Sequence, residues 1–216
     1  MKLFIICSKR FYNRIPMIKE VLEDYGHEVV LPNCYDNPNA EDEYRMIGEE
    51  EHANFKAAMY KKSEEVIRNV DGVLVINLNK NSQKNYIGGA TFLEMYDAFR
   101  MQKDIYLYNQ IPSGILTDEI IGFNPIIIDG DLCQIPRLNR VQSKIIKFMS
   151  DSTLNSIFAI SRAINVDFDV CLREINVLCD RGLVASKDTV DLYYITGLGI
   201  NMVEKEDVNF TKKLKR

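Results

Sequence analysis

The sequence predicts an α/β protein: a parallel sheet flanked by helices, followed by a C-terminal winged-helix domain. In residues 1–136, short apolar runs alternate with segments of helical spacing, which is typical of chains that build parallel sheets through right-handed crossovers. After Pro136 the pattern changes to three segments of helical spacing and then two strand-like runs. We therefore expect an α/β domain at residues 1–136 and a winged-helix domain with a basic tail at residues 139–216.

Five apolar runs predict the strands of the sheet. They span residues 3–7, 27–31, 72–78, 105–109 and 125–129. The first and third runs, LFIIC and GVLVINL, are continuously apolar, as expected for strands buried on both faces. We expect a flavodoxin-like or Rossmann-like sheet with the strand order 2-1-3-4-5. In such sheets ligands bind beyond the carboxyl ends of the strands.

Helical spacing fills the segments between these strands. Four residues mark the first helix: Ile18, Val21, Leu22 and Tyr25. Gly26 suits the position after the helix end. The polar residues 33–45 predict a loop, a long helix then runs to about Asn69, and residues 91–102 predict a further helix.

The C-terminal domain contains a candidate recognition helix at residues 168–181. Three acidic residues there outnumber two basic ones: Asp169, Glu174 and Asp180 against Arg173 and Arg181. An acidic helix is unfavourable beside DNA phosphates. Residues 139–216 as a whole are only mildly basic, with 12 Lys and Arg against 10 Asp and Glu. The sequence therefore leaves two alternatives for what this domain binds, DNA or a partner protein.

The overall composition indicates a globular protein of the cytoplasm. Hydrophobic residues make up 46% and charged residues 27%, which are ordinary values. The sequence has no apolar stretch long enough to cross a membrane, and the N-terminal apolar run is too short for a signal peptide. The five cysteines contain no C-x-x-C pair, so we expect free thiols and no metal site.

Residues 71–111 contain the pattern that points to chemistry. The buried strand delivers Asn77 to the ligand edge of the sheet, and Gly88-Gly89 allow the backbone to approach a ligand closely. We expect Thr91 to cap the next helix and Glu94 to lie in its first turn. A carboxylate in a first helical turn is stabilised as an anion, which suits a nucleophile. The plain alternative is that Glu94 serves only the helix dipole.

The segments GVLVIN, IGGATFLE and Gln102-Lys103-Asp104 before IYLYN resemble the nucleoside 2-deoxyribosyltransferase-like superfamily. Its members include transferases and 2′-deoxynucleoside 5′-phosphate N-hydrolases. The resemblance implies that Glu94 attacks the anomeric carbon of a nucleoside or nucleotide and forms a covalent glycosyl-enzyme, without metal or organic cofactor. It also implies that Ser8 and Arg10 contact sugar or phosphate. The resemblance further implies that five more residues bind the substrate: Asn77, Tyr86, Gly88, Gly89 and Thr91.

Two positions depart from the family pattern. Many of the transferases have Asp where this sequence has Gly88 and Asn77. Tyr86 or Asp71 is a candidate to replace the missing carboxylates. Two functions follow. The protein is either an enzyme that cleaves or exchanges the N-glycosidic bond, or a sensor that binds a nucleotide without turnover. In the sensor, ligand binding would change how the winged helix interacts with DNA or a partner protein. For both we expect a homo-oligomer.

Overall fold

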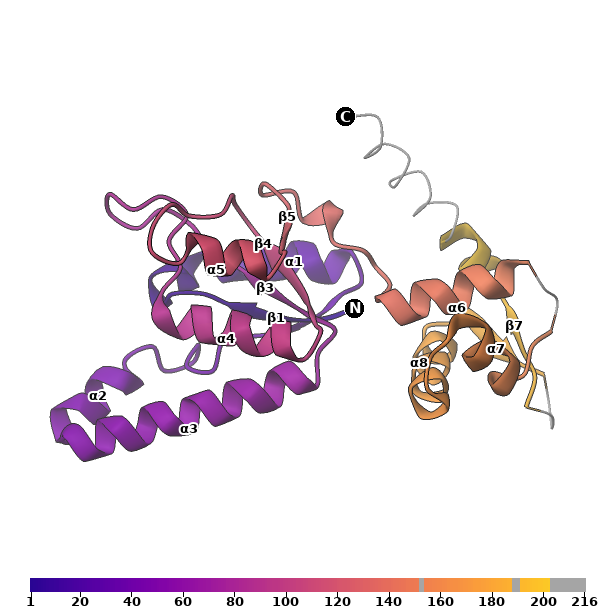
Figure 1. Ribbon diagram of the computed structural model, residues 1–216, viewed down its shortest axis with the longest axis horizontal. Helices are drawn as coiled ribbons and strands as arrows, with labels where there is room; N and C mark the ends of the chain where they lie inside the picture. The colour runs from indigo at the N-terminus through magenta and orange to yellow at the C-terminus, as the bar shows by residue number, and fades with distance from the viewer. Residues whose placement is uncertain (152–153, 188–190, 203–216) are drawn as a thin grey trace. The chain divides into compact units, whose positions relative to one another are not determined.

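The computed structural model describes residues 1–151, 154–187 and 191–202. The chain forms two compact units, Met1–Arg137 and Leu138–Arg216, which are coloured indigo to red and orange to yellow in Figure 1. Each unit is described by itself below. The basic residues 212–216, which the sequence analysis assigned to a tail, lie outside the described residues.

The first unit is built on a parallel sheet of five strands. These are β1 (Lys2–Ile6), β2 (Glu28–Val30), β3 (Gly72–Val75), β4 (Asp104–Leu107) and β5 (Ile126–Ile127). Their order is β2-β1-β3-β4-β5, and every neighbouring pair is parallel. In the register, Val73 of β3 lies opposite Phe4 of β1 and Ile105 of β4. The predicted fold class and strand order are therefore confirmed.

Helices connect the strands and cover both faces of the sheet (Figure 1). The described elements are η1 (Lys9–Arg14), α1 (Ile15–Asp24), α2 (Ala40–Ile47), α3 (Glu49–Arg68), α4 (Gly89–Arg100), α5 (Thr117–Gly122) and η2 (Leu132–Gln134). Gly26 has a φ of 82° after α1, a left-handed conformation that favours glycine.

The helix α2 covers residues 40–45 of the segment 33–45 that the sequence analysis predicted as a loop, so that prediction was wrong for those residues. This helix packs on α3, where the Tyr44 ring stacks on the Phe55 ring with centroids 4.7 Å apart. Its first turn is acidic, which the helix dipole favours. Four of its eight residues are charged, so the apolar pattern that reveals a helix in a sequence is short here.

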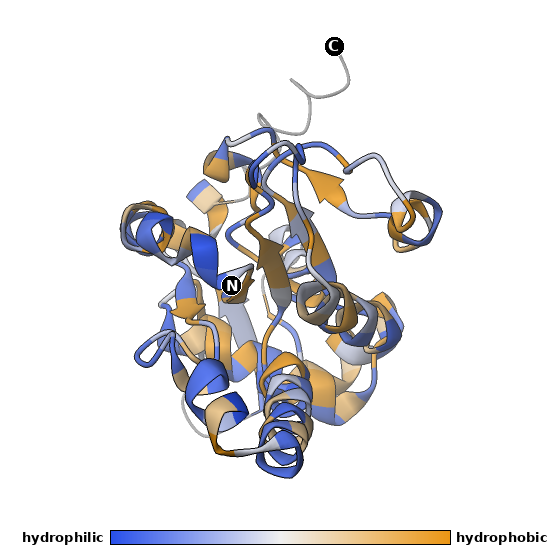
Figure 2. Cartoon of the chain, turned by 90° about the vertical axis from the view of Figure 1, so that its left-hand side faces the viewer, coloured by the Kyte–Doolittle hydropathy of each residue, from blue (hydrophilic) through white to orange (hydrophobic). Residues whose placement is uncertain are grey.

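Alternate residues of β1 belong to two separate cores. Leu3 and Ile5 pack with residues of α1 and η2, whereas Phe4 and Ile6 pack with residues of α3, α4 and α5. Successive side chains of a strand point to opposite faces, so both faces of the sheet are buried. In Figure 2 the strands are accordingly orange, while the surrounding helices carry blue residues on their outer sides.

The second unit contains three helices followed by an antiparallel hairpin. The elements are α6 (Arg140–Ser150), α7 (Ile157–Ile164), α8 (Phe168–Asp180), β6 (Val184–Ser186) and β7 (Tyr193–Ile195). Asn155, between α6 and α7, pairs in antiparallel fashion with Tyr193 of the hairpin. Residues 197–202 are again helical. This is the element order expected for a winged helix, and the unit has a hydrophobic core of its own.

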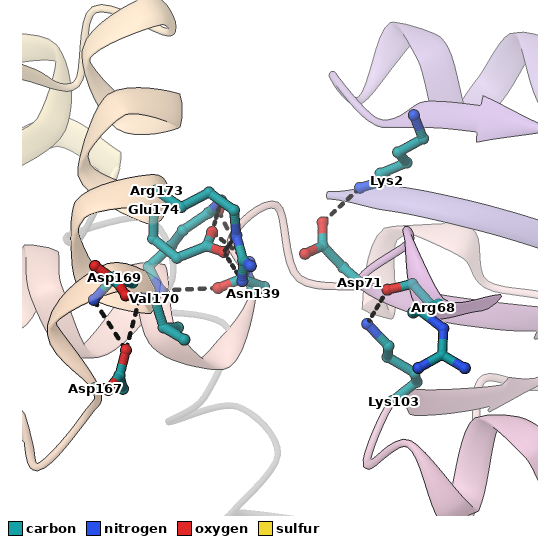
Figure 3. Close-up of polar contacts among 11 residues, drawn as sticks. Lys2, Arg68, Asp71, Lys103, Asn139, Asp167, Asp169, Val170, Arg173 and Glu174 are labelled. Atoms are coloured by element: carbon teal, nitrogen blue, oxygen red, sulfur yellow. Dashed lines mark hydrogen bonds and ion pairs between the residues drawn. The ribbon is translucent and has the colours of Figure 1, made fainter. Parts of the chain in front are cut away.

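A buried carboxylate joins α6 to α8 in this unit. Glu174 accepts hydrogen bonds from Asn139 Nδ2 and Gln142 Nε2, each at 2.9 Å, and from Arg173 (Figure 3). Asn139 in turn forms the capping box of α6 with Gln142. One of the three acidic residues predicted for the recognition helix thus points inward and fixes helix packing.

Across the part of the chain that the structure describes, every helix is too short or too polar to cross a membrane.

Candidate functional site

Glu94 lies on α4, but not where the sequence analysis expected it. The helix begins at Gly89 with Gly88 as its N-cap, and its first turn contains no acidic residue. Glu94 is the sixth residue and falls in the second turn. Thr91 is the third helical residue and is buried, so it does not cap the helix. Because the dipole effect falls off within the first turn, it does not hold Glu94 as an anion.

The Glu94 carboxyl is instead held by a residue of α3. The hydroxyl of Ser63 donates to Glu94 Oε1 at 2.8 Å. Ser63 is 4% exposed, and its oxygen accepts a hydrogen bond from Asn33 Nδ2 at 2.8 Å. Asn33 follows β2, so three segments that are distant in sequence meet at one carboxyl group. The sequence analysis did not identify Ser63 or Asn33.

The surroundings of Glu94 raise its pKa to about 7. Burial of the carboxyl is the largest cause, and the nearby Asp97 adds to it. The Ser63 hydrogen bond and the charge of Lys56 act in the opposite direction. Near neutral pH, Glu94 is therefore divided between its acid and its carboxylate form. A carboxyl group tuned in this way is suited to either proton transfer or nucleophilic attack.

Three further ionisable groups surround this carboxyl. Burial and then the Glu94 charge raise the pKa of the Cys7 thiol to about 12. Burial, followed by Cys7, Cys34 and Glu94, raises the pKa of Tyr12. Burial is also the first cause that raises the pKa of Cys34, whose thiol contacts Met59 Sδ at 3.6 Å. Cys7 and Tyr12 thus stay protonated beside Glu94 at neutral pH.

The cluster lies at the carboxyl edge of the sheet. Cys7 directly follows β1, Asn33 and Cys34 follow β2, and Tyr12 belongs to η1, in the connection after β1. The neighbours of β1 are β2 on one side and β3 on the other, so the connections after β1 and β3 leave in opposite directions. Ligands of open α/β sheets bind at this kind of switch point. Glu94 therefore has the position expected of a functional carboxyl.

Ser8 and Arg10 lie in the connection after β1. Ser8 precedes η1 and is half-buried, and its side chain makes no capping hydrogen bond. Arg10 is exposed. The intervening Lys9 forms an ion pair with Asp42 of α2, which ties this connection to the α2–α3 segment. Contacts of Ser8 and Arg10 with a substrate stay predictions.

Asn77 has a structural role at the end of β3. Its side chain is fully buried. Its Oδ1 accepts from the backbone N–H of Asn109 at 2.8 Å, and its Nδ2 donates to the carbonyls of Asn109 and Gln110. Both amide N–H donors are used in this way. Asn77 thus joins the ends of β3 and β4, and its expected contact with a ligand stays a prediction.

The loop before α4 is ordered by its own contacts. Lys80 Nζ lies 3.9 Å from the centroid of the Tyr86 ring. A side chain at Gly88 would come within 3.1 Å of the Tyr86 hydroxyl, whereas one at Gly89 would meet no atom within 4 Å. Gly88 therefore makes room for Tyr86. Gly89 leaves an open approach to the start of α4.

Asp71 cannot stand in for a missing active-site carboxylate, because it lies at the opposite edge of the sheet. It precedes β3, and its Oδ2 accepts a hydrogen bond from the backbone N–H of Lys2 at 2.6 Å (Figure 3). Lys2 begins β1. In a parallel sheet the amino ends of the strands share one edge, so the suggested replacement of a family carboxylate by Asp71 is wrong.

The outer side of α4 forms a shallow apolar groove with α5. It is lined by Phe92, Leu93, Tyr96, Phe99, Glu119, Gly122 and Phe123. The Phe123 ring lies 5.4 Å from the Phe92 ring and 5.3 Å from the Phe99 ring, centroid to centroid. Glu94 is not among the lining residues, so α4 separates this groove from the carboxyl cluster.

The described residues contain no group of three or more His, Cys, Asp or Glu side chains arranged to hold a metal ion. Their cysteines are free thiols.

Comparison with known proteins supports no assignment of a family or function. No protein-family model matches the chain, and no curated protein matches it. One similar solved structure is the adhesin competence repressor AdcR from Streptococcus pyogenes, with 18% sequence identity over 47% of this chain and 78% of AdcR. The TM-score of this likeness is 0.33, which is too low to support any argument about this chain.

Proposed function

We propose that the protein cleaves or exchanges the N-glycosidic bond of a nucleoside or nucleotide, with Glu94 as the nucleophile. The observation that carries this proposal is the Glu94 carboxyl itself. It is oriented by Ser63, surrounded by Cys7 and Tyr12, and lies at the carboxyl edge of the sheet. The resemblance of residues 71–111 to the nucleoside 2-deoxyribosyltransferase-like superfamily supplies the reaction class.

In the proposed reaction the ionised Glu94 attacks the anomeric carbon of the sugar. A bond forms between that carbon and the carboxylate oxygen as the carbon–nitrogen bond to the base breaks. Water or a second base then releases the sugar from the enzyme. The leaving base needs a proton, and Tyr86 is the proposed donor. The proximity of its hydroxyl to Gly88, at the start of α4, supports this role.

Substrate positioning is assigned to Ser8, Arg10, Gly89 and Thr91. The exposed Arg10 suits a 5′-phosphate, because its guanidinium presents paired donors to phosphate oxygens. The open space beside Gly89 favours close approach of a sugar to the backbone.

The test is a mixed pool of nucleosides and 2′-deoxynucleoside 5′-phosphates incubated with the protein. Chromatography of the products should reveal free base that increases with enzyme concentration. Adding a second, free base distinguishes transfer from hydrolysis, because a transferase produces a new nucleoside. Absence of free base across the whole pool would contradict the proposed reaction.

One observation favours a second candidate, a nucleotide sensor. The second unit has the element order of a winged helix and a core of its own, a domain type often used for readout. On α8 two acidic residues, Asp169 and Asp180, and one basic residue, Arg173, are exposed. The side chains of Phe158 and Phe168 are 64% and 43% exposed. Exposed acidic and aromatic side chains of this kind favour a protein partner over DNA. Calorimetric binding of a nucleotide without base release would support the sensor.

A further inference from the structure

Ser63 makes an unusual hydrogen bond for a serine inside a helix. It lies well within α3 and is 4% exposed. An interior helical serine commonly donates back to the carbonyl four residues earlier, which here belongs to Met59. That carbonyl instead accepts a hydrogen bond from Asn33 Nδ2 at 3.3 Å, while the Ser63 hydroxyl donates to Glu94.

The chemistry of these groups fixes where the Ser63 proton points. A backbone carbonyl oxygen can only accept, so the end of the Asn33 amide that faces Met59 must be the NH₂ group. The same nitrogen lies 2.8 Å from Ser63 Oγ and donates to it. A serine hydroxyl has a single hydrogen. Since its oxygen already receives an N–H, that hydrogen is directed to Glu94 Oε1.

We propose that Asn33 and Ser63 form a positioning relay, which presents one fixed O–H donor to Oε1 of Glu94 and leaves the second carboxylate oxygen available to react. This inference rests on the proposed nucleophilic role of Glu94. Neither residue touches the reacting atoms of the substrate; both act through Glu94. A donor that faces the carboxylate stabilises its ionised form over its neutral form.

Other titratable groups around Glu94 come from three elements and two connections. They are Cys7 directly after β1, Tyr12 of η1, Cys34 after β2, Lys56 of α3 and Asp97 of α4. Cys7, Tyr12 and Cys34 have raised pKa values and are neutral at pH 7. Besides Glu94 itself, the charged groups are Lys56 and Asp97, which oppose each other. The hydrogen bond from Ser63 is therefore a main influence that lowers the pKa of Glu94 and keeps part of this carboxyl group ionised near neutral pH.

The decisive measurement is the pKa of Glu94 in the full chain, followed by the carboxyl ¹³C resonance that disappears in Glu94→Gln. In Ser63→Ala we expect this pKa to rise by about one unit, the scale of one hydrogen bond to a charged group. In Asn33→Ala it should rise less, because Ser63 can then rotate toward Met59. In Asn33→Asp it should rise more than in Asn33→Ala, because the new carboxylate competes for the Ser63 proton.

Ser161→Ala is the matched control. Ser161 is a buried helical serine of the second unit, 7% exposed, whose hydroxyl donates to the Phe158 carbonyl. It should leave the Glu94 pKa unchanged. An unchanged pKa in either Ser63→Ala or Asn33→Ala would overturn the relay, so Asn33→Ala keeps this outcome accessible should Ser63→Ala fail to fold.

Base release separates the relay from the proposed function. With an active wild type, kcat/KM of Ser63→Ala at pH 6.5 should fall about tenfold, because a pKa raised by about one unit moves the pH–rate profile to higher pH. The loss should shrink at pH 9. If the wild type releases no base while the pKa shifts appear, the relay stands and the glycosidic function falls. If base is released with no pKa shift, the function stands and the relay falls.

Discussion

At the scale of single residues, the surroundings of Glu94 give its carboxyl group a different protonation behaviour from the one that its place in the sequence suggested. Its expected place in the first turn of a helix implied a stabilised anion. In the structure burial dominates and raises its pKa to about 7. Nucleophilic attack requires the ionised form, so the pH dependence of both activity and stability follows from this one group.

The substitution Glu94→Gln should reduce base release by several orders of magnitude. The change is nearly isosteric and removes the anionic nucleophile. Gln retains an oxygen that accepts from Ser63, so the fold and ligand affinity, measured by calorimetry, should change little. Turnover in Glu94→Gln equal to that of the wild type would exclude the nucleophilic role, and Glu65→Gln, at an exposed carboxyl of α3, is the matched control.

The rate of base release should increase with pH and reach a plateau above about 7. Below its pKa of about 7 Glu94 is protonated and cannot attack, so kcat/KM should fall tenfold per pH unit on the acid side. A pH–rate profile of the wild type measures this. A profile that instead decreases above pH 7 would indicate that the protonated Glu94 acts as a general acid.

Stability should show the opposite trend with pH. The folded-state pKa of Glu94 lies above the ordinary value of 4.5, so between pH 4.5 and 7 the native state binds more protons than the unfolded state, and stability falls as pH rises. Glu94→Gln removes this cost. At pH 8 it should be more stable than the wild type by about 2 kcal/mol, and at pH 4 the difference should vanish, as measured by urea denaturation.

At the scale of elements, the ends of β3 and β4 are joined by side-chain hydrogen bonds beyond the last residues of the strands. Asn77 and Asn109 bond reciprocally to each other's backbone. The loop after β3 is thereby fixed in relation to β4. Through that loop, the start of α4 and the turn that carries Glu94 are also positioned.

Asn77→Ala should therefore lower the free energy of unfolding by about 2–3 kcal/mol. It leaves the backbone N–H of Asn109 and the carbonyls of Asn109 and Gln110 without this partner in a buried place. Urea denaturation measures the loss. The control is Asn54→Ala, an exposed position of α3, which should change stability by no more than about 0.5 kcal/mol. Equal effects of the two substitutions would contradict the structural role of Asn77.

At the scale of the whole molecule, the two units have separate hydrophobic cores. Both cores of the first unit consist of residues that precede residue 138, and the core of the second unit consists of residues from Leu138 onward. The carboxyl cluster around Glu94 belongs wholly to the first unit. Folding and chemistry of that unit should therefore be independent of the second.

A protein limited to residues 1–137 should fold and keep the base-release rate of the full chain within about twofold, since units with their own cores fold alone. Circular dichroism and the base-release assay measure the two properties. Residues 138–216 should likewise fold cooperatively. Loss of base release in a folded 1–137 protein would instead assign the second unit a part in the reaction.

The sequence alone determined the class of fold, the five strands of the sheet and the change of pattern near Pro136, because apolar periodicity and turn residues are local signals. It also singled out Glu94. Only the tertiary structure decided what surrounds that carboxyl. The Ser63 donor is 31 residues away in the chain, and the strand order brings Asn33, Cys7 and Tyr12 to the same edge while it places Asp71 at the other. The physical reason is that pKa values and hydrogen bonds depend on neighbours in space, which local patterns do not contain.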